Sequence, residues 1–318
     1  MSTPSNLAKA VTLLNNESLV AIPTETVYGL AGNIYSDTSI QKIFELKKRP
    51  FYNPLIVHLK SYTELEKVAA AVPEKARILA ETFWPGPLTL VLKKQKNISD
   101  LITAGKDTVA VRVPNHPLAL ALLQELDFPL AAPSANPFGS ISPTTAAHVA
   151  TYFDAGQLFV LDGGACTKGI ESTIVGFEED QPVLYRAGAT SIAEIEAIVG
   201  PLKIVTKDDV APAAPGMLSK HYAPSTPTVF STDIDKTLLD YSDKRIGVLS
   251  FCSQREHPSI IHQEVLSNKG DLDEAAARLY AAMHELDSKK LELLLVEQLP
   301  NEGIGIAIND KLKRASIL

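Results

Sequence analysis

Polar side chains that could bind an anion occur in several apolar stretches or directly follow them. Arg112 lies inside the apolar stretch TVAVRV, where a buried guanidinium costs free energy unless an anion pairs with it. Its expected partner is a carboxylate, from either the protein or a substrate. The segment LAAPSANPFGSISP places Ser134, Asn136 and Ser142 ahead of a predicted helix. Hydroxyls, amides and a helix N-terminus can cradle a phosphate, although this segment does not match the P-loop pattern.

A basic segment, LKKRPFYNPLIVH, combines cations with an amide and an imidazole. Lys47 and Arg49 lie at the end of a predicted helix, where cations also complement the helix dipole. Asn53 precedes the next apolar stretch, and His58 lies within it, where a histidine is commonly structural. The combination favours a polyphosphate site, because lysine and arginine are frequent phosphate ligands.

Two further segments, PTETVYGLAGN and LDGGACTKGIESTIVGF, complete the polar set. Thr26 of the first belongs either to a helix N-terminus or to a cradle for a polar ligand. Glu171 and Ser172 come from the second, and Arg186 follows it, but carboxylates near glycine turns are commonly turn residues. Cys166 has no basic neighbour in the sequence, so we do not expect it to be a nucleophile. No metal-ligand spacing is found, and a divalent ion is expected to arrive with phosphates, as magnesium does.

The elements that must position these side chains alternate along the first 200 residues. We expect strands at 18–23, 54–59, 87–92, 108–113, 128–133, 158–163 and 172–177. We expect helices at 7–14, 38–48, 64–72, 74–83, 116–126 and 144–153. This alternation predicts an α/β domain with a mixed sheet, in which ligand groups gather at the carboxyl ends of strands.

A proline-rich connector precedes a second, smaller alternation. Strands are expected at 228–230, 245–251, 259–265 and 291–299, with helices at 233–239, 272–287 and 309–316. We predict two domains joined by a linker at 201–227. The first spans 1–200, and the second, at 228–318, is a three-layer domain with a mostly parallel sheet. Within the linker, AAPGMLSKHYAP at 213–224 carries Lys220, His221 and Tyr222, which are unusual choices for a spacer.

The composition disfavours several classes of protein. The net charge of −7 disfavours a protein that coats nucleic acid, since that binding rests on cationic phosphate contacts. The two cysteines offer no disulfide framework, no secretory signal is visible, and no apolar run is long enough to span a bilayer. We expect a cytoplasmic protein.

The motifs together resemble, in order, the YrdC family of threonylcarbamoyl-AMP synthases. The resemblance is carried by PTETVYGL, KKRPFYNPLIVH, WPGPLTLVL, VRVPNHP, APSANPFGSISPTTAAHV, GIESTIV and YRAGA. A K-x-R pattern falls on Lys47 and Arg49, and an S-x-N pattern on Ser134 and Asn136. PGMLSKHYAP, followed by a small domain ending in GIGIAINDKLKRAS, resembles the long form of the family.

The resemblance implies a fold, a reaction and partners. The fold is a twisted, open mixed-sheet α/β domain with a concave, positively lined cavity, here followed by a small Rossmann-like three-layer domain. The enzyme is a nucleotidyltransferase that makes threonylcarbamoyl-AMP and pyrophosphate from ATP, L-threonine and bicarbonate. Magnesium arrives with ATP, and no tightly bound organic cofactor is implied. A downstream threonylcarbamoyl-transferase uses the product to modify the adenosine beside the anticodon of tRNA, and a weak tRNA contact is left open.

The resemblance also assigns ligand residues by position. The residues expected to bind the threonine moiety are Thr26, His58, Arg112 and Ser172. The residues expected to bind ATP are Lys47, Arg49, Asn53, Thr108, Ala132, Ser134, Asn136, Ser142, Arg186 and His221, with Ala132 acting through its backbone. The linker is expected to act as a lid, although Ser219 and Lys220 stand where the family often has an aromatic and an arginine. No general base is assigned, and Lys47, Arg49, His58 and Arg112 are expected to act by positioning.

Two alternatives stay open from the sequence. The first is a module that binds double-stranded RNA or tRNA without catalysis, which sparse aromatic platforms and basic stripes disfavour. The second is a related carbamoyl or nucleotidyl transferase acting on another amino acid, since a hydroxyl-rich pocket could also accept serine.

Overall fold

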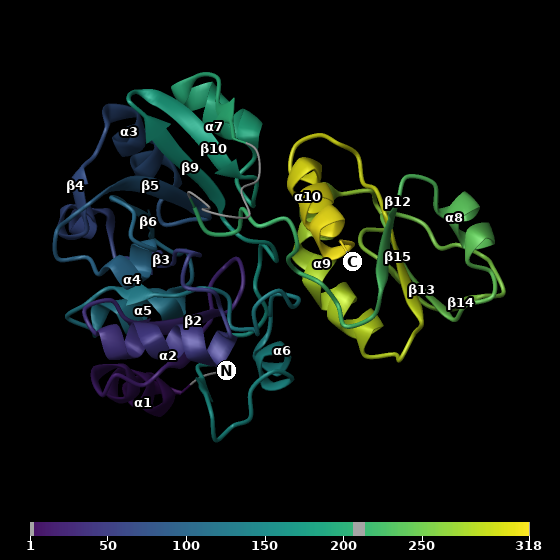
Figure 1. The fold of residues 1–318 in the computed structure, drawn as a ribbon, viewed down its shortest axis with the longest axis horizontal. Helices are drawn as coiled ribbons and strands as arrows, with labels where there is room; N and C mark the ends of the chain where they lie inside the picture. The colour runs from purple at the N-terminus through teal and green to yellow at the C-terminus, as the bar shows by residue number, and fades with distance from the viewer. Residues whose placement is uncertain (1–2, 206–213, 318) are drawn as a thin grey trace.

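The computed structural model describes residues 3–205 and 214–317, which build two sheets with their own helices (Figure 1). The strands of the first sheet are β1 (Val20–Ile22), β2 (Gly29–Asn33), β3 (Ile56–His58), β4 (Ala69–Ala71), β5 (Leu88–Lys94), β6 (Thr108–Arg112), β7 (Leu130–Ala131), β8 (Phe159–Val160), β9 (Thr173–Glu178), β10 (Gln181–Arg186) and β11 (Lys203–Ile204). The helices of this part are α1 (Pro4–Asn15), α2 (Asp37–Lys47), the 3₁₀ helix η1 (Tyr62–Lys67), α3 (Glu74–Phe83), α4 (Asp100–Thr103), α5 (Pro117–Gln124), α6 (Ala146–Ala150) and α7 (Ile192–Val199).

The first sheet is mixed, as the sequence predicts. Its order is β11-β10-β9-β5-β6-β3-β7-β2-β1-β8, with β4 pairing with β5 at the side. The central strands β3 and β6 run parallel, and their register places His58 directly opposite Arg112. Both residues end their strands, so two predicted ligands meet at one edge of the sheet.

The second sheet is fully parallel, in the order β12-β15-β13-β14. Its elements are β12 (Thr228–Ser231), α8 (Ile234–Asp240), β13 (Ile246–Ser250), β14 (Ile260–Val265), α9 (Leu272–Asp287), β15 (Leu293–Glu297) and α10 (Gly305–Ala315). Helix α8 covers one face, while α9 and α10 cover the face that is turned toward the first sheet (Figure 1). The predicted three-layer arrangement is confirmed.

The two parts share a hydrophobic core. Ile141 and Ile170 of the first part are buried in the same cluster as Leu279 of α9 and Leu312 of α10. Burial of apolar area is the main source of folding free energy, so this cluster joins the parts energetically.

Some predicted elements are wrong. Residues 64–72 do not form an α-helix: η1 ends at Lys67, and β4 then pairs with β5 through Ala69 and Lys94. Strand β2 occupies the PTETVYGLAGN segment, where a helix start was considered, and β10 was not predicted. Helix α10 begins at Gly305, four residues before the expected 309. Residues 206–213 of the predicted linker lie outside the described residues.

Among the residues that the structure describes, no helix is both long and apolar enough to cross a bilayer.

Candidate active site

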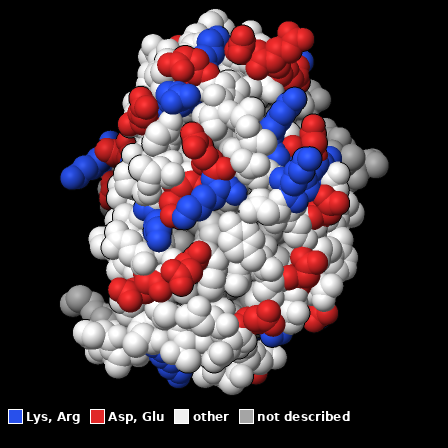
Figure 2. Space-filling model, turned by 90° about the vertical axis from the view of Figure 1, so that its left-hand side faces the viewer, with Lys and Arg blue, Asp and Glu red and all other residues white. Residues whose placement is uncertain are grey.

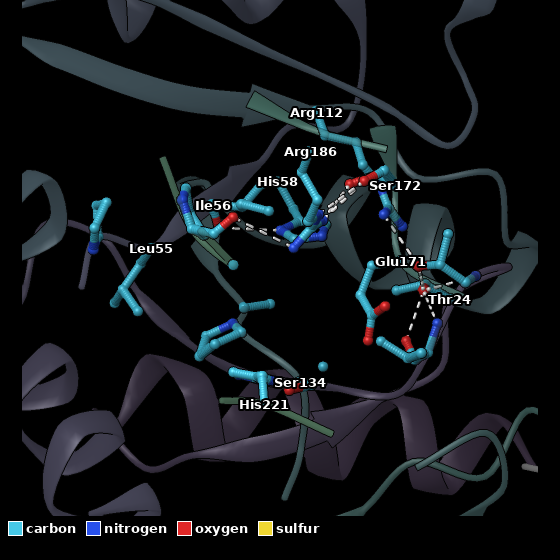
Figure 3. A pocket seen from close by; sticks show the side chains of 18 of the residues that line it. Thr24, Leu55, Ile56, His58, Arg112, Ser134, Glu171, Ser172, Arg186 and His221 are labelled. Carbon is cyan, nitrogen blue, oxygen red and sulfur yellow. Dashed lines mark hydrogen bonds between the residues drawn. The ribbon is translucent and has the colours of Figure 1, made fainter. Parts of the chain in front are cut away.

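A cavity lies at the edge of the first sheet where β3 and β6 end, and the segment 214–224 closes one side of it. Figure 3 shows its labelled side chains converging from several elements on one space. Most predicted ligands line it: Thr26, Arg49, His58, Arg112, Ala132, Ser134, Ser172, Arg186 and His221. Its volume is about 60 Å³, which is room for a few water molecules.

Arg112 anchors one side of the cavity. Its side chain is buried, and it donates hydrogen bonds to Glu25 Oε2 (3.1 Å) and to Thr26 Oγ1 (3.0 Å). The carboxylate partner expected from the sequence is therefore present within the protein. Arg112 Nε and Glu25 Oε1 have no hydrogen-bond partner among the described residues, so the pair retains an unused donor and an unused acceptor.

His58 lies beside Arg112 as a neutral imidazole. Burial, reinforced by the charge of Arg112, lowers the pKa of His58 to about 3. Its Nδ1 lies 3.2 Å from the Ile56 carbonyl oxygen, and because a carbonyl only accepts, Nδ1 must carry the proton. Nε2 is then a hydrogen-bond acceptor at the cavity wall.

Arg186 and Arg49 supply cations that have no carboxylate within ion-pair distance among the described residues. Arg186 donates to the carbonyl oxygen of Ser172 through Nε (3.1 Å) and Nη2 (2.9 Å), and to Ser172 Oγ (3.1 Å). Arg49 donates to the carbonyl oxygens of Asn53 (3.1 Å) and Pro54 (2.8 Å). Burial, with Arg186 nearby, lowers the pKa of Arg49. Two buried guanidinium groups bonded only to neutral oxygens favour an anionic ligand between them.

Lys47, Asn136 and Ser142 lie behind the cavity wall and do not line the cavity. The Lys47 ammonium donates to the carbonyl oxygens of Ser134 and Asn136, both at 2.5 Å. The Asn136 amide donates to the Ser140 carbonyl oxygen (2.8 Å). Burial lowers the pKa of Lys47 well below its usual value. These residues hold the loop at 133–142 in shape, and their predicted contact with ATP stays a prediction.

Asn53 and Thr108 are also absent from the cavity lining. The Asn53 side chain is fully buried, and both polar atoms of its amide have no partner among the described residues. Thr108 opens β6, opposite Lys93 and four residues before Arg112. The structure does not bring Thr108 together with the other predicted ligands.

The segment 214–224 passes directly over the cavity. Gly216 has φ +79°, and a Cβ there would lie 2.7 Å from Arg186 Nη1, so this approach requires glycine. The His221 ring packs edge-on against Phe138, with centroids 5.7 Å apart, and its buried Nδ1 has no partner among the described residues. Burial and surrounding cations lower the pKa of His221 well below its usual value. Ala223 N donates to the Gly139 carbonyl oxygen (2.7 Å), which ties the segment to the first part.

Sequence reasoning missed two features of the site. Glu171, considered a turn residue, is buried in the cavity wall and accepts hydrogen bonds from Ser142 Oγ (2.7 Å) and Tyr280 Oη (2.8 Å). Lys311 Nζ lies 3.7 Å from the same carboxylate. Tyr280 and Lys311 belong to the C-terminal part, and no local pattern in the sequence links them to Glu171.

Burial raises the pKa of Cys166 to about 12, so its thiol is unsuited to nucleophilic attack.

Comparison with known proteins places this geometry in a family. Residues 12–188 match the Sua5/YciO/YrdC family, described as "Telomere recombination", and residues 190–316 match the family "Threonylcarbamoyl-AMP synthase, C-terminal domain". The threonylcarbamoyl-AMP synthase of Bacillus subtilis is 39% identical over 98% of this chain and 92% of its own length. The chain belongs to the Sua5/YrdC family. The resemblance carried by the motifs is confirmed.

Solved structures of the Sua5/YrdC family agree over the whole chain. Pyrococcus abyssi Sua5 complexed with L-threonine superposes with a TM-score of 0.90 at 38% identity, covering 98% of this chain and 94% of that one. A Sua5 variant from the same organism, with a consecutive histidine and tyrosine replaced by alanine, gives a TM-score of 0.89 at 36% identity, covering 98% and 92% of the two chains. The predicted fold class is confirmed for both parts of the chain.

Proposed function

We propose that the chain joins ATP, L-threonine and bicarbonate into threonylcarbamoyl-AMP and pyrophosphate. The observation that carries the proposal is one cavity lined by two kinds of group. Arg112, His58 and hydroxyl groups suit a small amino acid. Arg49 and Arg186, which have no carboxylate partner among the described residues, suit phosphates.

Threonine is proposed to bind at the Arg112 side. The free Nε of Arg112 can donate to the substrate carboxylate, while Glu25 and Thr26 hold the guanidinium in place. The neutral His58 Nε2 can accept from the amine or the hydroxyl group of the substrate. Ser172 Oγ, 2.7 Å from Thr89 Oγ1, supplies a further hydroxyl group.

ATP is proposed to lie against Arg49, Arg186, the Ala132–Ser134 backbone and His221. The threonine amine and bicarbonate first condense to a carbamate with loss of water. A carbamate oxygen then attacks the α-phosphorus of ATP, and pyrophosphate leaves. This reaction needs two anionic reactants to be aligned and their charge offset, which arginines can provide.

The linker at 201–227 is proposed to act as a lid, through its described residues 214–224 (the lid segment). The lid segment covers one side of the cavity, and we expect it to move away when the nucleotide enters. A closed lid would keep water from the labile acyl-adenylate. The domain division 1–200, 201–227 and 228–318 belongs to this proposal.

The remaining partners are proposed from the chemistry. Magnesium would arrive with ATP and neutralise phosphate charge, as it commonly does at nucleotide sites. The product would pass to a downstream threonylcarbamoyl-transferase that modifies tRNA. Cys166 and Cys252 are both free, which suits the reducing cytoplasm.

A module that only binds RNA is less well supported. On the face shown in Figure 2, Lys and Arg are interspersed with Asp and Glu and form no continuous basic stripe. Nucleic-acid binding depends on such cationic contacts. A weak tRNA contact elsewhere on the molecule stays a prediction.

Pyrophosphate release tests the proposed function. Purified protein should release pyrophosphate only when ATP, threonine and bicarbonate are all present, and omission of any one should abolish the signal. Serine in place of threonine tests the strictness of the amino-acid side. Release that is independent of threonine, or absent throughout, would rule out the proposed reaction.

A further inference from the structure

Helix α10 of the C-terminal part buries two cations, Lys311 and Arg314, one helical turn apart. Both side chains are 1% exposed. Burying a charge is costly unless it is paired and hydrogen-bonded, and a small hydrophobic core does not require cations. Both side chains point out of their own domain, toward the lid segment and the wall of the cavity.

Arg314 contacts three residues of the lid segment. Its Nε donates to the Leu218 carbonyl oxygen (2.9 Å), and its own carbonyl oxygen accepts from His221 N (3.2 Å). The guanidinium carbon lies 4.8 Å from the centroid of the Tyr222 ring, and Nη1 lies 3.5 Å from Tyr222 Oη. Asp310 balances part of the charge at 3.4 Å. One side chain thus fixes both the backbone and the aromatic ring of the segment.

Lys311 joins the lid segment to the cavity wall. Its ammonium donates to the Ala187 carbonyl oxygen (3.1 Å) and lies 3.7 Å from the carboxylate of Glu171. The same ammonium lies 5.7 Å from the Tyr222 ring centroid, within reach of a cation–π contact. Glu171 lines the cavity, so Lys311 connects α10 to the site as well as to the segment that covers it.

Tyr222 is held in a conformation that needs such support. Its φ is +63°, in the left-handed region, and it is almost fully buried. A bulky residue other than glycine rarely adopts that region, and the free-energy cost of doing so must be offset by its surroundings. The Tyr222 ring packs against Lys311 and Arg314 of α10, and both His221 and Tyr222 line the cavity.

We propose that Lys311 and Arg314 are positioning residues of the adenylation reaction, which hold the lid segment closed and His221 in the cavity. The proposal rests on the lid function proposed above and gives the C-terminal domain a part in turnover. Neither side chain needs to touch a substrate. Their effect is transmitted through Tyr222 and Glu171.

The test compares full-length Arg314→Met, Arg314→Lys and Lys311→Met with Lys313→Met. Lys313 lies on the same helix but is exposed and contacts Phe230, so it is the matched control. We measure kcat from pyrophosphate release. We also measure amide hydrogen exchange of the peptide 214–224, at a temperature where every variant is folded.

We expect Arg314→Met and Lys311→Met to lower kcat by about tenfold or more and to speed exchange in 214–224, while exchange in β5 and β9 stays as in the unmodified protein. Arg314→Lys should retain intermediate activity, and Lys313→Met should match the unmodified protein. If Arg314→Met does not fold, Arg314→Lys and Lys311→Met carry the test.

Unchanged kcat in folded Arg314 and Lys311 variants would overturn the proposal, and so would faster exchange in 214–224 without loss of turnover. These outcomes differ from a failure of the proposed function. In that case the unmodified protein would itself release no pyrophosphate in response to threonine.

Discussion

At the scale of single residues, the site is built from cations whose partners leave part of their bonding capacity unused. Within the described part of the chain, Arg112 is bonded to Glu25 and Thr26 but has no partner at Nε, and Arg49 and Arg186 are bonded only to neutral oxygens. Such groups cost free energy in the empty protein. An anionic ligand recovers part of that cost, which favours ligand binding at these residues.

Arg112→Ala should raise the KM for threonine by roughly 30-fold, since a charged hydrogen bond contributes about 2 kcal/mol. The KM for ATP should change much less. The variant leaves the buried Glu25 carboxylate without its cationic partner. Arg112→Ala combined with Glu25→Gln therefore serves as the control and should show the same selectivity. Equal increases in both Michaelis constants would contradict the role assigned to Arg112.

At the scale of elements, parallel strands and the lid segment bring the residues together. His58 and Arg112 meet because β3 and β6 are parallel neighbours in register. The lid segment approaches Arg186 only because Gly216 has no side chain. Helix α10 holds the other side of this segment through Arg314.

Gly216→Ala should lower kcat by about tenfold, because the new Cβ would meet Arg186 and displace the lid segment. Gly200→Ala is a matched control: its φ is +81°, close to the +79° of Gly216, but it has no atom within 4 Å of the new Cβ. Both variants should lose stability from the positive φ, by about 1–3 kcal/mol as measured by urea unfolding. Equal kcat in the two variants would show that the close approach to Arg186 is unimportant.

Histidines between α6 and α9 should make stability depend on pH. The rings of His148 and His284 stack with centroids 4.1 Å apart. Burial, followed by the charge of His148, lowers the pKa of His284 to about 4 from its ordinary 6.5. Since the folded protein disfavours protonation, this contribution to stability is complete above pH 6.5 and is lost as the pH falls toward 4.

The free energy of unfolding should therefore fall between pH 6.5 and 4, by at most about 1.4 kcal/mol per pH unit for each such histidine. His284→Gln should reduce that slope, as measured by urea titrations at several pH values. An identical slope in the variant would show that His284 does not titrate on unfolding.

The sequence predicted the chemistry of the site better than its geometry. An arginine inside an apolar strand and a hydroxyl-rich loop are local signals, so Arg112 and Ser134 were found. Lys47 was also singled out, yet it points into the 133–142 loop, because the direction of a side chain depends on tertiary packing. Lys311 and Arg314 lie in the segment GIGIAINDKLKRAS but were not singled out, since basic residues toward the C-terminal end of a helix are ordinary.

The elements were predictable where periodicity was strong and uncertain where it was weak. The helix expected at 64–72 is rich in good helix formers, but strand pairing with β5 prevails over that propensity. Strand β2 was missed because it contains two glycines, and glycine is uncommon in strands. Contacts between distant segments, such as Glu171 with Tyr280, cannot be derived from one local pattern.

At the scale of the whole molecule, the two parts share the core that contains Ile141, Ile170 and Leu279. We therefore expect them to unfold together in a single transition. Leu279→Ala, in the C-terminal part, should cost about 2–5 kcal/mol. It should shift the transition reported by Trp84, the only tryptophan, which lies in the first part.

Ile261→Ala is the control for this experiment. Ile261 is in the same C-terminal sheet but is 49% exposed, so its loss should leave the Trp84 transition nearly unchanged. If Leu279→Ala also left the Trp84 midpoint unchanged, the two parts would be independent folding units.

The most direct test of the central claim is to identify the product. The protein is incubated with ATP, threonine and ¹³C-bicarbonate, and the nucleotides formed are separated and weighed by mass spectrometry. We predict threonylcarbamoyl-AMP that is one mass unit heavier than the product made with ordinary bicarbonate. A nucleotide product that carries no label, or no new nucleotide at all, would contradict the account.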